Sequence, residues 1–393
     1  HHRPGRCARG SRGIAAVARS GHPVVAFVSA MGHTTDRRIQ LAQKCAPSPP
    51  ARELDMLTAN GETITAPLVA MCLQALGIPA ISLTGLQAGV RTSGHHSRAR
   101  IQEIETQRIK SELGAGRVCV VAGFQGVTES MEITTLGRGG SDTTAVALAA
   151  ALGSRTCEIF TDVDAIYSAD PRVVARPRKI LFISYEEMLE LAAVGAKVMH
   201  PRAVEIGELY GVEIHVRSSF KKAAGTMIVA QVPMEDRNRV RGVAHESNIA
   251  KITVRGVPDR PGIAAALFEP LGAASISVDV IVQNVGLTGA TDITFTVDEG
   301  DLKQAVALVQ EANRQIGAQE VLSSGGLAKL SIVGTGMLGT PGIAGRMFRT
   351  LADARINIDM ISTSEIRITC LVDRKRAEDG VRALHTAFDL DVD

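Results

Sequence analysis

Apolar runs alternate with amphipathic stretches along the first part of the chain. The run at 24–29 is apolar up to its last residue, which is typical of a strand buried on both faces of a parallel sheet. Similar runs stand at 80–83, 118–122, 156–161 and 212–216, with helical patterns between them at 55–76, 143–152, 184–193 and 201–210. This alternation predicts an α/β domain over 13–232, an open and mostly parallel sheet in an αβα sandwich.

A different pattern begins after residue 232. Residues 233–248 open with a polar stretch, and we assign them to a linker. Beyond it, the tetrapeptide Pro-Gly-Ile-Ala at 261–264 returns at 341–344, and apolar positions around it repeat at the same displacement. Each copy predicts a βαββαβ module with two helices on one face of its sheet, the first at 249–325 and the second at 326–393.

Composition narrows the class of protein. Of 393 residues, 43 are Lys or Arg and 41 are Asp or Glu, so charge gives no reason to expect a nucleic-acid or membrane partner. The six cysteines have no zinc-binding spacing, and no apolar run approaches the ~20 residues that span a bilayer. We therefore expect free thiols in the cytoplasm. Residues 1–12 show no periodicity and are predicted to be an aberrant or disordered start.

The strongest chemical signal is a glycine-rich turn that runs into an apolar helix, Thr-Leu-Gly-Arg-Gly-Gly-Ser-Asp at 135–142. Glycines allow tight turns and close approach of the backbone, and a helix N-terminus attracts anions. Arg138 adds a positive fork suited to a carboxylate or a phosphate. A capped loop with no ligand is the alternative.

Weaker signals follow other strands. The acidic stretch at 161–172 could hold a nucleotide with its metal ion, or could be a polar turn. Lys197 could reach a phosphate or could be a solvated surface residue, and His200 before Pro201 favours packing or capping. Glu62 could bind an ammonium group.

Three familiar phosphate and nucleotide motifs are missing or misleading. The sequence has neither a Gly-x4-Gly-Lys-Ser/Thr loop nor the His-Arg-Asp and Asp-Phe-Gly pair of protein kinases. The glycines at 334–339 match a dinucleotide fingerprint, but too little chain follows them for a dinucleotide fold, so we interpret them as a loop of the repeat.

In order along the chain, these segments resemble the aspartate kinases. The resemblance rests on Val-Ser-Ala-Met-Gly at 28–32, Glu-Leu-Asp-Met-Leu at 53–57, Val-Ala-Gly-Phe-Gln-Gly at 121–126, Thr-Thr-Leu-Gly-Arg-Gly-Gly-Ser-Asp at 134–142, Thr-Asp-Val-Asp at 161–164 and Gly-Ala-Lys-Val-Met-His-Pro-Arg at 195–202. The paired C-terminal repeats resemble ACT modules. The resemblance implies an amino-acid kinase fold that transfers the γ-phosphoryl group of ATP, with Mg²⁺, to the side-chain carboxylate of L-aspartate. That is the first step toward lysine, threonine and methionine.

The resemblance also implies roles for individual residues. Arg138, Asp142 and Lys197 would be catalytic, and no side chain is assigned to a metal. Aspartate would contact Ser29, Thr35, Glu62, Phe124, Arg138, Ser141 and Asp142. The nucleotide would contact Thr161, Asp162, Tyr167, Arg172 and Lys197. A lysine or threonine effector would contact Asp259, Gly262, Ile263, Ala264, Asp279, Gln283 and Asn357, in an oligomer of identical or different chains joined through the ACT modules.

The chain departs from the family pattern at three places. The opening strand and its Lys-Phe/Tyr-Gly-Gly segment have no counterpart, so the first strand of the sheet and a catalytic Lys are expected to be missing. Ala165 replaces a Gly and Thr63 replaces an Arg. The first departure leaves an alternative open, a catalytically defective chain that binds an effector. A kinase for glutamate or N-acetylglutamate is a third interpretation, which the segment at 53–62 and the paired repeats disfavour.

Overall fold

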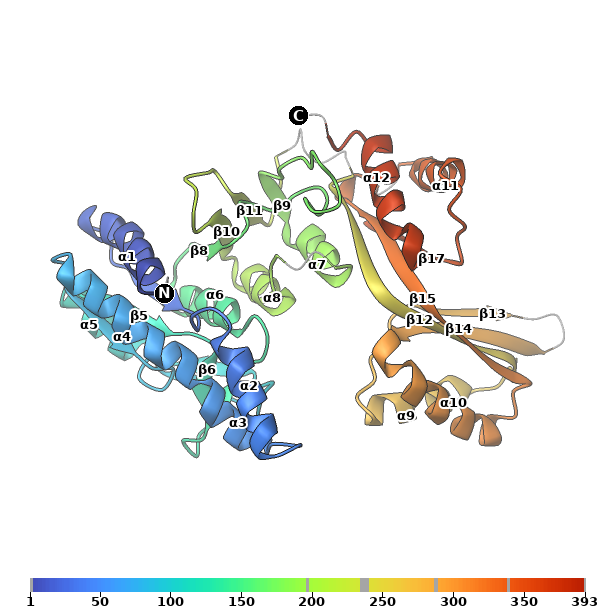
Figure 1. Ribbon diagram of the computed structural model, residues 1–393, viewed down its shortest axis with the longest axis horizontal. Helices are drawn as coiled ribbons and strands as arrows, with labels where there is room; N and C mark the ends of the chain where they lie inside the picture. Colours follow the sequence, from blue (N-terminus) through green and yellow to red (C-terminus); the bar gives the residue numbers. More distant parts are fainter. Residues whose placement is uncertain (1–2, 196–197, 234–239, 286–288, 338–339, 392–393) are drawn as a thin grey trace. The chain divides into compact units, whose positions relative to one another are not determined.

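The computed structural model describes residues 3–195, 198–233, 240–285, 289–337 and 340–391 (Figure 1). Its chain divides into two compact units, each described here by itself. The first unit comprises 1–166, 181–192 and 197–232. The second comprises 167–180, 193–196 and 233–393. The predicted boundary at 232 therefore differs from the structure at two short segments, which belong to the second unit.

A parallel sheet lies at the centre of the first unit, as predicted. Its strand order is β1 (Val25–Val28), β5 (Val118–Ala122), β2 (Ala80–Leu83), and every residue of the middle strand is buried. Helix α4 (Asn60–Ala75) packs on this sheet through Leu73 and neighbouring small residues. Further helices are α2 (Thr34–Cys45), α3 (Ala51–Thr58), α5 (Gln107–Gly114) and α6 (Gly140–Leu152).

Two more sheets complete the first unit. One has the order β8 (Thr156–Thr161), β10 (Glu213–Ser218), β11 (Thr226–Val229), β9 (Phe182–Ser184), with β8 parallel to β10. The other has the order β4 (Ile101–Ile104), β3 (Val90–Thr92), β6 (Gln125–Val127), β7 (Ile133–Thr135). Helices α7 (Tyr185–Ala193) and α8 (Pro201–Tyr210) lie between β9 and β10 in sequence.

An aberrant or disordered start was predicted for 1–12, but the described residues of this segment, 3–12, are helical. Helix α1 spans Arg3–Arg19 and packs against α4. Cys7, Ser11 and Ala15 are buried at four-residue spacing, and the Ser11 hydroxyl donates to the Cys7 carbonyl at 2.8 Å. The buried stripe consists of small residues, which is why the hydrophobic pattern of this segment is weak.

The second unit is built on one six-stranded antiparallel sheet. Its order is β13 (Ile281–Val285), β14 (Ala290–Asp298), β12 (Gly242–Pro258), β15 (Glu320–Val333), β17 (Arg367–Asp373), β16 (Met360–Thr363). Strands β12 and β15 are long and run through both modules (Figure 1). The helices are α9 (Ile263–Ala273), α10 (Leu302–Ile316), α11 (Ile343–Asp353) and α12 (Ala377–Ala387), with 3₁₀ turns at Glu299–Asp301, Thr335–Met337 and Arg374–Arg376.

The internal repeat is confirmed by backbone geometry. Gly262 and Gly342 cap α9 and α11 with φ of 91° and 94°, and both helices have 11 residues. Each helix is followed by a residue with positive φ, Ser275 and Arg355. The glycines from 334 onward follow β15, whose neighbours are antiparallel, so a dinucleotide-binding βαβ unit is excluded there. Residues 338 and 339 lie outside the described residues.

The predicted linker is partly a strand. Residues 242–247 form the first half of β12 and pair with 328–333 of β15. The second module therefore receives its fourth strand from a segment that precedes the first module in sequence. Asn248, with a φ of 70°, stands where the register shifts between the two halves of β12. Each module has its own hydrophobic core, and Leu271 and Leu351 occupy equivalent buried positions in the two cores.

Candidate active site and effector pocket

The glycine-rich turn forms an open helix N-terminus in the first unit. Helix α6 begins at Gly140, its cap residue Gly139 has a φ of 65°, and no side chain caps it. A Cβ atom at Gly139 would stand 2.3 Å from the Cβ of His200, so only glycine fits there. Backbone N–H groups of an uncapped first turn can bind an anion. Arg138, just before the cap, is exposed.

A half-buried arginine fixes this turn. The Arg202 guanidinium donates to the carbonyls of Leu136 at 2.8 Å and Ala99 at 3.0 Å. His200 Nδ1 accepts from the backbone N–H of Arg202 and caps α8, which confirms the predicted capping role. Arg202 ends the motif at 195–202, and the sequence predicts no role for it. An Arg one residue inside a Pro-initiated helix carries no local signal for this contact.

Residues predicted to contact aspartate gather where β1 and β5 end. Gly123 donates its N–H to the carbonyl of Val28, and a Cβ atom at Gly123 would stand 3.0 Å from the Cβ of Ser141. Phe124, with a φ of 70°, donates its N–H to Thr144 Oγ1 of α6 at 3.2 Å. The start of α6 therefore lies at the carboxyl ends of β1 and β5, the edge where ligands bind in open α/β sheets.

Glu62 reaches the same edge from the first turn of α4. It is 3% exposed, and its Oε1 accepts from the N–H of Ala30 at 3.0 Å. Its second oxygen, Oε2, has no hydrogen-bond partner among the described residues, and neither does the buried Nη1 of Arg38. Burial raises the pKa of Glu62 to about 7, although Arg38 acts in the opposite direction. An unsatisfied oxygen on a buried carboxylate needs an explanation, such as a bound ligand, ion or water.

The other predicted aspartate contacts differ in exposure. Ser29 is exposed directly after β1, next to Ala30, and Thr35 lies in the first turn of α2, half-buried. Asp142 lies in the first turn of α6, and burial raises its pKa to about 6. Both Glu62 and Asp142 are thus acids whose ionised forms lack full compensation from the protein.

The predicted nucleotide contacts are divided between the two units. Thr161 Oγ1 donates to Asp162 Oδ1 at 3.1 Å at the end of β8, in the first unit. Tyr167 and Arg172 belong to the second unit, where Arg172 donates to the Asp170 carboxylate through Nε and Nη2 and lowers the pKa of that carboxyl. Lys197 lies outside the described residues.

Asp55 was not predicted as a site residue, although it lies within the motif at 53–57. It is 1% exposed, and its carboxylate accepts from the Thr135 hydroxyl at 2.6 Å and from the N–H groups of Thr135 and Ser97. His96 Nδ1 lies 2.9 Å from it. This one carboxylate therefore joins the 96–97 loop to the strand that leads into the glycine-rich turn.

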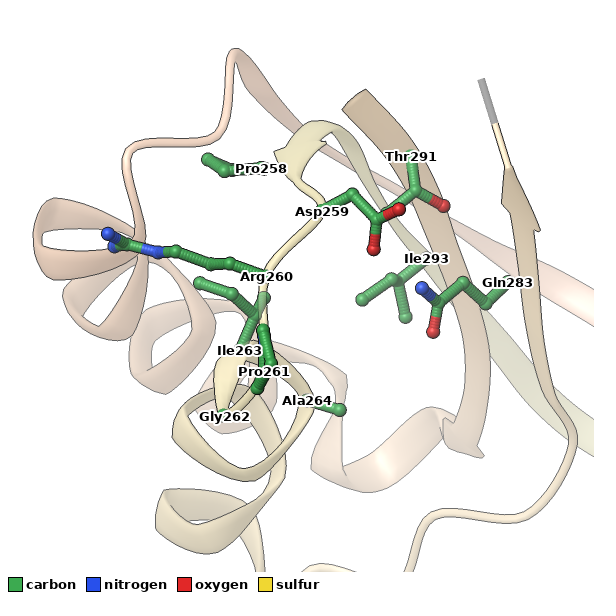
Figure 2. A pocket seen from close by; sticks show the side chains of 10 residues that line it. All are labelled: Pro258, Asp259, Arg260, Pro261, Gly262, Ile263, Ala264, Gln283, Thr291 and Ile293. Carbon is green, nitrogen blue, oxygen red and sulfur yellow. The ribbon is translucent and has the colours of Figure 1, made fainter. Parts of the chain in front are cut away.

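A cavity of about 180 Å³ opens in the first ACT-like module, beside the start of α9 (Figure 2). Five of the predicted effector contacts line it: Asp259, Gly262, Ile263, Ala264 and Gln283. Figure 2 shows the Asp259 carboxylate and the Gln283 amide facing the space between the Pro261 turn and β13.

The other two predicted effector contacts do not line this cavity. Asp279 forms an ion pair with Lys329, a 4%-exposed lysine that also contacts Glu246 at 3.2 Å. Asp359, its counterpart in the repeat, pairs with Lys251 at 2.6 Å. Asn357 is exposed in the second module.

The described residues contain no cluster of three or more His, Cys, Asp or Glu side chains that could hold a metal ion. None of the helices described is long and apolar enough to cross a membrane.

Comparisons with known proteins agree with this architecture. The family model described as "Amino acid kinase family" matches residues 4–218, and the ACT domain model matches 252–312 and 330–388. The aspartate kinase of Pseudomonas putida is 47% identical over 373 residues, covering 95% of this chain and 91% of the relative. The aspartokinase of Mycolicibacterium smegmatis is 47% identical over 378 residues, covering 95% and 90%.

Solved structures of aspartate kinases are also similar to this chain. Escherichia coli aspartokinase III, in complex with aspartate and ADP, aligns with a TM-score of 0.75 at 27% identity, over 91% of this chain and 80% of that one. The Synechocystis aspartate kinase aligns with a TM-score of 0.54 at 42% identity, over 98% and 67%. With its kinase unit, its paired ACT modules and relatives matched over nearly their whole length, the chain belongs to the aspartate kinases.

Proposed function

We propose that the carboxyl edge of β1 and β5, together with the N-terminus of α6, is the aspartate site of this kinase. The observation that carries the proposal is Glu62, whose free Oε2 lies buried at this edge. The substrate's ammonium group would pair with Glu62, and its carboxylates would meet Arg138 and the N–H groups of α6. Ser29, Thr35, Phe124, Ser141 and Asp142 complete the proposed contacts.

The chemistry proposed here is phosphoryl transfer from ATP to the side-chain carboxylate. A carboxylate with a pKa near ~4 is already ionised at neutral pH, so no general base is required. The obstacle is the approach of two anions. Arg138, Lys197 and the positive end of α6 would offset that repulsion, so positioning and electrostatics supply most of the acceleration.

The nucleotide would be held by Thr161, Asp162, Tyr167, Arg172 and Lys197. Mg²⁺ in nucleotide sites is usually held by one or two carboxylates with phosphate and water oxygens. The exposed Asp162 at the end of β8 fits that requirement, whereas Asp164 is already paired with Lys221 at 2.6 Å. When bound, Mg²⁺ would neutralise phosphate charge.

The experiment that tests this function traps the product. The full chain is incubated with ATP, Mg²⁺ and aspartate, and the acyl phosphate is captured as a hydroxamate with hydroxylamine. We expect product with aspartate and none with glutamate or N-acetylglutamate. A chain that binds lysine or threonine but yields no hydroxamate would instead be the catalytically defective regulatory protein.

We further propose that the cavity beside α9 binds lysine or threonine as a feedback effector. E. coli aspartokinase III has been solved in complex with lysine and aspartate, and its chain aligns with a TM-score of 0.69. Asp259 suits an ammonium group, and the N–H groups at the start of α9 suit a carboxylate. Asp279 and Asn357 stay candidates for contacts in an oligomer.

The effector proposal predicts a thermal shift. Lysine or threonine at saturating concentration should raise the melting temperature, because a ligand that binds only the folded state stabilises it. Gln283→Ala should reduce that rise by weakening binding about tenfold. Asn284→Ala, on the same strand but outside the cavity lining, is the control. An equal rise in all three proteins would exclude this cavity as the effector site.

A further inference from the structure

The second unit includes a short segment whose neighbours in sequence, on both sides, belong to the first unit. Ile166, in the first unit, donates its N–H to Thr226 Oγ1 at 2.9 Å. Residues 167–180, here called the inserted segment, belong to the second unit, and Leu181 is again in the first. The inserted segment carries Tyr167 and Arg172, two of the proposed nucleotide contacts.

A buried hydrogen-bond network fixes the inserted segment to the second module. Ser168 is completely buried, and its hydroxyl lies 2.9 Å from Nε2 of His385, a residue of α12 that is 1% exposed. The same hydroxyl accepts from the N–H of Arg178 at 2.8 Å and lies 3.2 Å from the carbonyl of Leu390. One hydroxyl thus joins both ends of the segment to the last helix of the chain.

The backbone and the core add to this attachment. The carbonyl of Ser168 accepts from the N–H of Val243, at the start of β12, at 2.7 Å. Ala169 and Val174 pack in the core of the second module with Leu384 and Leu390. The inserted segment therefore covers the free edge of the first half of β12, where an unpaired N–H would otherwise remain.

A second segment, which leads in sequence to Lys197, contacts the same half-strand. Gly195 has a φ of 110°, and a Cβ atom there would stand 2.4 Å from the carbonyl oxygen of His245. Gly195 precedes Lys197 by two residues. The other end of β12, at Pro258, lines the effector cavity. One strand, about 50 Å long for its 17 residues, thus extends from the effector cavity to both segments.

We propose that Ser168 and His385 are positioning residues of the nucleotide site. Their hydrogen bond fixes the inserted segment, with Tyr167 and Arg172, in one preset arrangement on the second module before any nucleotide binds. A preset segment loses less conformational freedom when the nucleotide binds, which strengthens binding. This inference rests on the proposed function, because that function assigns the two residues to the nucleotide.

The test measures MgADP binding to the full chain by titration calorimetry. Ser168→Ala and His385→Ala each remove the buried bond, and we expect the dissociation constant to rise about tenfold, in line with the loss of one buried hydrogen bond. His385→Gln keeps a nitrogen near the Nε2 position and should bind within about threefold of the wild type. The KM for aspartate should not change in any variant.

Ser331→Ala is the matched control. Ser331 is also completely buried in the second module, and its hydroxyl bonds Thr369 at 2.8 Å, away from the inserted segment. Equal weakening in Ser331→Ala and Ser168→Ala would overturn the proposal, as would unchanged or tighter binding in both Ser168→Ala and His385→Ala. If Ser168→Ala does not fold, the His385→Gln and His385→Ala pair decides.

The same experiment separates this inference from the proposed function. Wild-type chain that binds MgADP but forms no aspartyl hydroxamate would refute the phosphoryl transfer and leave the positioning role standing. Wild-type chain that does not bind MgADP would refute both.

Discussion

At the scale of single residues, Glu62 combines a proposed role in substrate binding with a cost in stability. Its pKa of about 7 means that it is partly protonated at neutral pH, whereas an ammonium ligand pairs with the ionised form. Aspartate binding should therefore strengthen as pH rises from 6 to 8. The KM for aspartate, measured across this range, should fall in the wild type.

Glu62→Gln should remove that pH dependence. The variant should raise the KM for aspartate about tenfold or more at pH 8, since it loses a charge-assisted hydrogen bond, and the difference should shrink toward pH 6. A wild-type KM that is flat over this pH range would contradict the assignment of Glu62 to the ammonium group.

The stability of the fold should respond in the opposite direction. Burial raises the pKa of Glu62 in the folded state above its ordinary value of 4.5. The folded protein is therefore most stable with respect to this group below pH 4.5, where Glu62 is protonated in both states, and it loses that stability as the pH rises through 7. Glu62→Gln should therefore raise the free energy of unfolding at pH 8 by an amount on the order of 2 kcal/mol, and it should have little effect at pH 4.5. Melting temperatures measured at the two pH values check this expectation.

Asp55 makes a second prediction at this scale. Asp55→Ala leaves the Thr135 and Ser97 donors without their acceptor in a buried site, so we expect a loss of about 3 kcal/mol in the free energy of unfolding. Glu53→Gln, on the exposed side of the same helix, should change it by less than about 0.5 kcal/mol. Urea denaturation measures both, and equal effects would contradict this role for Asp55.

Only part of the glycine-rich turn could be predicted from the sequence. Its glycines and its helix were predictable, because turns and helix starts are local. The partners of the turn were not, since Arg202 and Asp55 reach it from segments 60 to 80 residues away and no periodicity reports such contacts. Asp279 was predicted to contact the effector, and within the described residues it forms an ion pair with Lys329, which lies 50 residues downstream.

At the scale of elements, the first half of β12 is the clearest failure of pattern reasoning. Residues 242–247 were assigned to the linker at 233–248, which opens with a polar stretch. Their partner strand is about 85 residues downstream, so no local signal marks the pairing. By contrast, α9 and α11 were predictable from the repeat, because each begins at its own Pro-Gly turn.

Helix α11 offers a matched pair of glycines. Gly345 and Gly342 both have open space where a Cβ atom would go, but only Gly342 has a positive φ, of 94°. Gly345→Ala should therefore stabilise the protein by about 0.5–1 kcal/mol, whereas Gly342→Ala should destabilise it by about 1 kcal/mol. Thermal melting checks the signs, and two changes of the same sign would contradict the backbone geometry.

At the scale of the whole second unit, two modules share two strands. Because β12 and β15 each contribute to both cores, a cavity in one core should weaken both modules. Leu351→Ala should lower native-state hydrogen-exchange protection in α9 as well as in α11, and the repeat-equivalent Leu271→Ala should do the reverse. A loss confined to the mutated module would show that the modules open independently.

The order of the strands also limits how such a gene can be rearranged. Module 2 is encoded in two pieces, at 242–247 and from 327 onward, and module 1 is inserted between them. A single recombination breakpoint within this region would separate a module from one of its strands. Two coordinated breakpoints, near Asn248 and near residue 326, would be needed to exchange module 1 alone. We therefore expect the effector specificity of this lineage to change by substitution within the cavity more readily than by module shuffling.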